Sequence, residues 1–175
     1  MNYTHQFFND YSETAHPACL QAVAHQPEQQ QIGYGLDEIS ARARDLIQAQ
    51  IHAPAAEIHF CSGGTQANLT VIGSMLRPHE AVIAVESGHI ATHETGAIEA
   101  TGHKVIHVPH VHGKLTPDAV THALTAHPNE HSVKPRMLFI SQSTEFGTVY
   151  SKDELLALRA LCDAHNLYLY IDGAR

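Results

Sequence analysis

Apolar and polar positions alternate along the chain in a regular order of short runs and longer amphipathic stretches. Short, mostly apolar runs are typical of buried strands, and they occur at 57–61, 81–85, 105–108, 137–141 and 167–171. The stretches between them predict helices at about 37–51, 65–76, 89–101 and 151–165, with another beginning at 116–118. In the first helix Ile39, Ala43 and Leu46 fall on one face, as in an amphipathic helix.

Residues at the expected helix ends support this assignment. Ser151-Lys152-Asp153-Glu154 is a capping box, and Thr116 followed by Pro117 is typical of an N-cap and first helical position. Gly102 and Asn166 can adopt the left-handed conformation that ends a helix.

Strands that alternate with helices predict an α/β fold. Because the strands are apolar runs rather than period-two patterns, we expect three α/β/α layers around a mostly parallel sheet of five strands. Residues 1–35 are polar and irregular and are predicted to form an N-terminal arm, whereas residues 36–175 form one domain. In such sheets ligands bind beyond the carboxyl ends of the strands.

Composition and charge narrow the class of protein. Hydrophobic residues make up 43% of the 175, which indicates a globular chain. A net charge of −8 disfavours nucleic acid as a partner. The chain has no apolar run of ~18 residues and no apolar leader at its start, so we expect a cytoplasmic protein without a membrane partner. The sixteen histidines are densest at His103, His107, His110 and His112, and no cysteine or carboxylate pairs with that cluster at zinc-like spacing, so no metal site is expected.

A glycine-rich turn joins the first predicted strand to a helix. In Cys61-Ser62-Gly63-Gly64-Thr65-Gln66-Ala67-Asn68, the glycines allow close approach of a ligand, and Thr65 offers a hydroxyl at the N-cap. Free N–H groups at a helix N-terminus favour a bound phosphate at Gly64 and Thr65. An ordinary strand–helix turn is the alternative. No lysine follows the glycines, so the segment is not a P-loop.

Two further residues follow strands and carry candidate chemistry. Asp172 precedes Gly173-Ala174-Arg175, and a carboxylate there can pair with a cationic ring nitrogen such as that of pyridoxal phosphate. A helix N-cap is the alternative for Asp172. His89, in Ser87-Gly88-His89, can stack on a flat cofactor or transfer a proton, although a single loop histidine carries little weight in this chain.

Taken together and in this order, these segments resemble the fold-type-I pyridoxal-phosphate enzymes. Within them the chain is similar to the threonine aldolase and aromatic amino acid β-eliminating lyase family. The resemblance runs from about Asn9-Asp10 through Tyr34-Gly35 and 64–68 to Arg175. It implies the large domain of that fold, pyridoxal 5′-phosphate as cofactor, an amino acid substrate and a homo-oligomer.

The resemblance also implies roles for single residues. Gly64 and Thr65 would hold the cofactor phosphate, and His89 would stack on the pyridine ring. Asp172 would pair with the ring nitrogen, and Arg175 would lie near the cofactor and the substrate carboxylate. A further residue, Tyr34, would belong to a loop that reaches an active site across the dimer.

The chain departs from the family pattern at two places. Many threonine aldolases have a second active-site histidine where this chain has Glu145, within Ser143-Thr144-Glu145-Phe146-Gly147. Glu145 is therefore a catalytic candidate, and both aldol cleavage and β-elimination stay open. The Schiff-base lysine of the family follows the Asp-Gly-Ala-Arg segment, and none of the chain's lysines matches it; these are Lys104, Lys114, Lys134 and Lys152.

Two functions follow as hypotheses. The first is a pyridoxal-phosphate lyase that cleaves a β-hydroxy amino acid such as threonine to glycine and an aldehyde. Under it, residues 36–175 are a partial cofactor-binding domain, inactive alone, that pairs with itself or with a complementary C-terminal chain. The alternative is a non-catalytic phosphate-ligand binding or interaction domain with a degenerate form of the same fold.

Overall fold

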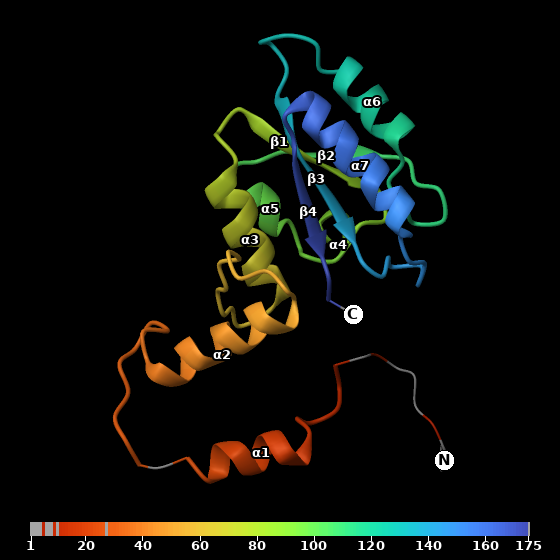
Figure 1. Cartoon of the computed structure of the whole chain (residues 1–175). Coiled ribbons are helices and arrows are strands. Elements are labelled where there is room, and N and C mark those ends of the chain that lie inside the picture. Colours follow the sequence, from red (N-terminus) through yellow and green to blue (C-terminus); the bar gives the residue numbers. More distant parts are fainter. Residues whose placement is uncertain (1–4, 6–8, 10, 27, 175) are drawn as a thin grey trace. The chain divides into compact units, whose positions relative to one another are not determined.

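The computed structural model describes residues 5, 9, 11–26 and 28–174 (Figure 1). By its contacts the chain divides into two compact units, residues 1–60 and 61–175. The helices are α1 (Pro17–Ala24), α2 (Glu38–Gln50), α3 (Gly64–Met75), α4 (His89–Thr92), α5 (Ala97–Ala100), α6 (Pro117–Thr125) and α7 (Lys152–His165). The strands are β1 (Glu80–Val85), β2 (Val105–Val108), β3 (Lys134–Ser141) and β4 (Tyr168–Asp172). None of the described helices combines the length and the apolar character needed to cross a membrane.

The first unit contains two helices with well-defined starts. Helix α2 confirms the predicted helix, and the Asp37 carboxylate caps it by accepting a hydrogen bond from Ser40 N at 2.8 Å. That backbone hydrogen bond lowers the pKa of Asp37. Helix α1 is not predicted from the pattern of apolar positions, because it buries no residue and its signals are local: the His16 ring caps it, and Pro17 occupies its first turn. Helix α2 lies in this unit, and a domain boundary after residue 35 stays a prediction.

Two predicted elements are wrong in detail. Residues 57–61 form no strand. Glu57 and Phe60 are exposed, and no strand among the described residues pairs with this segment. The apolar residues of the segment are therefore not enough to make it a strand. The predicted helix at 89–101 is broken into α4 and α5, because Thr95 and Gly96 adopt left-handed conformations with φ of 51° and 75°.

The second unit is a three-layer α/β/α structure, as predicted. Its sheet has four strands, one fewer than predicted, in the order β2-β1-β3-β4. All three pairings are parallel. Figure 1 shows α6 and α7 on one side of the sheet and α3 and α5 on the other. All carboxyl ends of the strands therefore meet at one edge.

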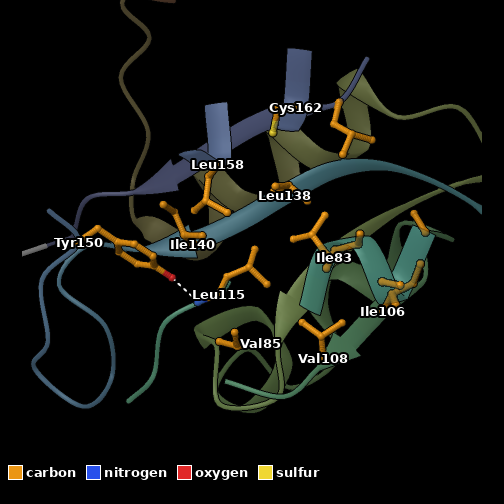
Figure 2. Close-up of a cluster of buried hydrophobic side chains, with 14 residues drawn as sticks. Ile83, Val85, Ile106, Val108, Leu115, Leu138, Ile140, Tyr150, Leu158 and Cys162 are labelled. Carbon is orange, nitrogen blue, oxygen red and sulfur yellow. Dashed lines mark hydrogen bonds between the residues drawn. The ribbon is translucent and has the colours of Figure 1, made fainter. Parts of the chain in front are cut away.

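Side chains from both faces of the sheet form the core. On the side of α6 and α7, the buried cluster includes Ile83, Leu138, Ile140, Leu158 and Cys162 (Figure 2). On the other side, it includes Ile72, Val82, Ile98, Met137 and Phe139. Each fully buried large apolar side chain contributes about 1.5–3 kcal/mol relative to exposure. The loops at the carboxyl edge therefore extend from a sheet that is closely packed on both faces.

The turn after β1 favours a glycine at position 88. The Gly88 N–H donates to Val85 O at 2.8 Å, and a Cβ on Gly88 would lie only 3.0 Å from that oxygen. This close turn leads directly into α4 and places Ser87 and His89 at the end of a buried strand.

The start of α7 makes the stability of the fold depend on pH. The capping box of Ser151 and Glu154 is present, and Lys114 Nζ lies 2.8 and 2.9 Å from the two carboxylate oxygens of Glu154. The Lys114 hydrogen bond, with the Ser151 N–H, lowers the pKa of Glu154 from 4.5 to about 2. Because the folded-state pKa is depressed, the stabilisation is complete above about pH 4.5 and is lost as the pH falls through about 2.

We therefore expect Glu154→Gln to unfold at a lower urea concentration than the wild type at pH 7. The difference between the urea midpoints of the wild type and the variant should become smaller as the pH falls from 4.5 toward 2. Urea midpoints measured across this range provide the test. Asp153→Asn is the control, because Asp153 lies in the same first turn but makes no ion pair with a described residue. An equal, pH-independent shift in both variants would contradict the prediction.

Candidate functional site

The amino end of α3 is open. Gly63 is its N-cap, and no side chain of a described residue caps the helix. Gly64 and Thr65 are exposed, and a Cβ on Gly63 or Gly64 would meet nothing within 4 Å. Thr65 lies in the first turn and is not the N-cap, contrary to the sequence expectation. The first amide groups of α3 therefore face open space, where they can bind an anion.

His89, at the start of α4, contacts a buried carboxylate that has no predicted role. Its Nδ1 lies 2.8 Å from Glu94 Oε1. The Glu94 side chain is fully buried, whereas that of His89 is 37% exposed. The break between α4 and α5 turns Glu94 back toward His89. In the tautomer whose Nδ1–H donates to Glu94, Nε2 is the acceptor atom of the ring.

Asn68 joins this pair to Asp172. Its side chain is buried in α3, and its Nδ2 donates to Glu94 Oε1 at 2.6 Å and to Asp172 Oδ2 at 3.4 Å. Its Oδ1 accepts from the Tyr170 hydroxyl at 2.6 Å. A single amide thus connects side chains from the loop after β1 and from the end of β4. We call Asn68, His89, Glu94, Tyr170 and Asp172 the Asn68 network.

Tyr170 stays protonated in this network. Burial raises its pKa to about 12, and the nearby carboxylates of Asp172 and Glu94 add to the effect. The hydroxyl therefore donates to Asn68 over the whole physiological range, which fixes the amide so that its nitrogen faces the two carboxylates.

Removing that hydroxyl should have a modest, measurable cost. We expect Tyr170→Phe to lower the free energy of unfolding by about 1 kcal/mol, because Asn68 loses one hydrogen bond. Urea unfolding measures this change. Tyr168→Phe is the matched control, since the hydroxyl of Tyr168 makes no hydrogen bond to a described residue. Equal stability losses in the two variants would show that the Tyr170 hydroxyl has no such role.

Glu145 lies at the same edge of the sheet. Its Oε1 accepts a hydrogen bond from Ser141 Oγ at 2.7 Å. Ser141 ends β3 and is in register with Asp172 on β4, and Gln142 N donates to Asp172 O at 2.8 Å. The loop that carries Glu145 and the strand that carries Asp172 are therefore neighbours.

Buried polar atoms without a partner gather at this edge. Among the described residues, the buried side-chain atoms without a hydrogen-bond partner are Glu94 Oε2, Glu145 Oε2, Ser87 Oγ and Arg159 Nε. Three of these four follow β1 or β3. Buried polar groups are normally paired in native proteins, so unpaired ones suggest a missing polar ligand or water.

Two predicted site residues, Arg175 and Tyr34, lie outside the described part of the second unit. Arg175 lies outside the described residues. Tyr34 is fully exposed in the first unit, with φ of 65°, and lines a cavity of about 520 Å³ formed by residues 34–59. Its predicted role in a partner's active site stays a prediction.

Another cavity, in the second unit, has a volume of about 340 Å³. It is lined mainly by apolar surface from the 111–117 loop and α7. Its charged pair, Lys114 and Glu154, is engaged in the ion pair at the start of α7. None of the predicted catalytic or cofactor-binding residues lines it.

These features fit pyridoxal phosphate. An open helix N-terminus suits its phosphate, and an anchored carboxylate at Asp172 suits its ring nitrogen. His89 is tied to Asp172 through Glu94 and Asn68, so the two predicted ring contacts belong to one hydrogen-bonded unit.

Comparisons with known proteins show similarity to threonine aldolases. The chain is 34% identical to the low specificity L-threonine aldolase of Pseudomonas aeruginosa, over 99% of this chain and 51% of that protein. It is 28% identical to the low specificity L-threonine aldolase of Saccharomyces cerevisiae, over 81% of this chain and 37% of that protein. The chain thus spans about half the length, or less, of these curated relatives.

Solved structures give the same result. The Leishmania major threonine aldolase is 50% identical and superposes with a TM-score of 0.94, over 97% of this chain and 49% of that one. An aromatic aminotransferase from Pyrococcus horikoshii, 20% identical, shares only the fold, with a TM-score of 0.64 over 88% of this chain and 40% of that one. The Beta-eliminating lyase family matches residues 11–175, and the chain therefore belongs to this family of pyridoxal-phosphate enzymes.

Proposed function

We propose that the protein containing this chain is a pyridoxal-phosphate lyase that cleaves a β-hydroxy amino acid such as threonine to glycine and an aldehyde. The observation that carries the proposal is the Asn68 network, which ties His89 and Asp172 together at the carboxyl edge of the sheet. The similarity to threonine aldolases supports the choice of substrate.

The chain would hold the cofactor at two places. The amides of Gly64 and Thr65, with the positive end of α3, would bind its phosphate. Asp172 would pair with its ring nitrogen, while Asn68 keeps that carboxylate in place. When bound, pyridoxal phosphate supplies an electron sink for negative charge at the substrate Cα.

Two residues, His89 and Glu145, would act as proton acceptors. His89 would present Nε2 as an acceptor when its Nδ1–H donates to Glu94, and the same contact would fix the plane of the ring for stacking. Cleavage of the Cα–Cβ bond also requires a base for the proton of the β-hydroxyl group. Glu145 is our candidate, because its Oε1 is held by Ser141 and its Oε2 has no partner among the described residues.

The rival function explains less of the structure. A non-catalytic phosphate-binding domain would need the open end of α3, but it would have no use for buried carboxylates with unpaired oxygens at Glu94 and Glu145. We further propose that the protein acts on an amino acid, forms a homo-oligomer and is cytoplasmic. Residues 36–175 would form a partial cofactor-binding domain.

The test is to incubate the whole protein that contains this chain with pyridoxal phosphate and threonine and to measure glycine and acetaldehyde. We expect cleavage that depends on the cofactor. Saturable cofactor binding without cleavage of threonine or of a bulkier β-hydroxy amino acid would favour the rival. Borohydride reduction followed by mass spectrometry locates the reacting lysine. A single stoichiometric adduct on Lys104, Lys114, Lys134 or Lys152 would show that this segment supplies it.

A further inference from the structure

A polar cavity lies at the opposite edge of the sheet from the Asn68 network. Its volume is about 250 Å³, and its walls are almost wholly polar. Residues that line it include Arg77, Glu80, Lys134, Arg136, Asn166 and Tyr168. Glu80, Lys134 and Tyr168 begin β1, β3 and β4, so the cavity sits at the amino ends of these strands.

Positive charge is concentrated there. The chain has only ten Lys and Arg residues and a net charge of −8, yet three of those ten line this cavity. Glu80 is the one carboxylate among the lining residues. The cavity therefore carries a local excess of two positive charges in an otherwise acidic protein.

Arg136 is held in place by its surroundings. Its guanidinium lies 4.7 Å from the centroid of the Tyr168 ring, and its Nε lies 3.8 Å from Glu80 Oε1. Its side chain is only 18% exposed. The two Nη atoms donate no hydrogen bond to any described residue. The guanidinium group is therefore held in position with its Nη–H donors free to bind a ligand.

The other two cationic side chains, Arg77 and Lys134, are also available to bind an anion. Glu80 cannot neutralise them, because its Oε2 already accepts from Arg77 N at 2.9 Å and its Oε1 faces Arg136. Arg77 and Lys134 are exposed, and their charged groups form no ion pair within the described part of the chain.

We propose that this cavity binds a small phosphate anion, such as inorganic phosphate, pyrophosphate or a compact phosphate ester, at a site separate from the cofactor's. A preoriented guanidinium can bind two oxygens of one phosphate, while a second arginine and a lysine neutralise the remaining charge. The polar walls offer no surface for an apolar body, which favours a compact anion over a large organic ligand.

Calorimetric titration of the purified protein with pyrophosphate, at constant ionic strength, tests the proposal. We expect one saturable site at millimolar or lower concentration. Arg136→Gln and Lys134→Gln should each weaken binding about tenfold or more. Loss of the Arg136 side chain could change the local structure around its ion-pair partner Glu80. Lys134 is exposed and makes no such ion pair with a described residue, so Lys134→Gln tests the binding without that side effect. Lys152→Gln, a change at an exposed lysine of α7, is the matched control and should bind as the wild type does.

The α3 terminus must be excluded as the site of this binding. Gly64→Asp places a carboxylate there, with open space for its side chain, and should repel an anion from α3 only. We expect the saturable site to persist in this variant. No saturable binding up to about 10 mM would overturn the proposal. So would binding that Gly64→Asp abolishes and Arg136→Gln leaves unchanged, an outcome that would leave the proposed lyase function intact.

Discussion

Asp172→Asn should lower kcat/KM for threonine cleavage by about 10²- to 10³-fold, the usual cost of removing one preorganised electrostatic contact. The change keeps the size of the side chain, and an amide oxygen can still accept from Asn68 Nδ2. It removes the negative charge that would keep the cofactor's ring nitrogen protonated. The loss should therefore appear in kcat/KM, while the urea midpoint changes little.

The control for this experiment is Asp153→Asn, which removes an exposed carboxylate in the first turn of α7 that is not hydrogen-bonded to any residue of the Asn68 network. It should retain wild-type activity. If Asp172→Asn retains activity within a few-fold of the wild type, the charge at position 172 is not used and the cofactor assignment fails. If it unfolds with the wild type's midpoint and cleaves no threonine, the assignment is supported.

The sequence predicts the second unit of the fold well because its elements are defined by local signals. The capping box at Ser151 and the left-handed cap at Asn166 both appear where expected. Elements whose form depends on distant partners are predicted less well. Residues 57–61 have strand-like composition but pair with no strand in the described part of the chain, and the break at Thr95 and Gly96 interrupts an otherwise helical stretch.

The site shows the same division. Asp172, His89 and the Gly64–Thr65 turn are recognisable from their places after strands, but the residues that connect them are not. One signal was available, because Tyr168, Tyr170 and Asp172 alternate along β4 and so fall on one face. Asn68 could also have been noticed as a polar residue four positions before the buried Ile72. Nothing in the sequence pairs Glu94 with His89, because that contact depends on the turn between α4 and α5.

Asn68→Leu should have the largest effect on stability at the site. The residue is 1% exposed, and leucine has a similar size but no polar atoms. The Tyr170 hydroxyl and the Glu94 carboxylate would each lose a partner without gaining access to water. Buried groups left unpaired cost about 1–3 kcal/mol each, so we expect a loss of about 2–4 kcal/mol in the free energy of unfolding.

The same change should reduce threonine cleavage more than its effect on stability explains. Asp172 would lose its anchor, and Glu94 would retain only His89. Activity should therefore be measured well below the unfolding temperature, where the variant is folded. Thr70→Leu is the matched control: it makes the same kind of substitution at an exposed position of α3, and both its stability and its activity should stay close to those of the wild type. A folded Asn68→Leu protein with full activity would show that the Asn68 network stabilises the fold but does not position the catalytic residues.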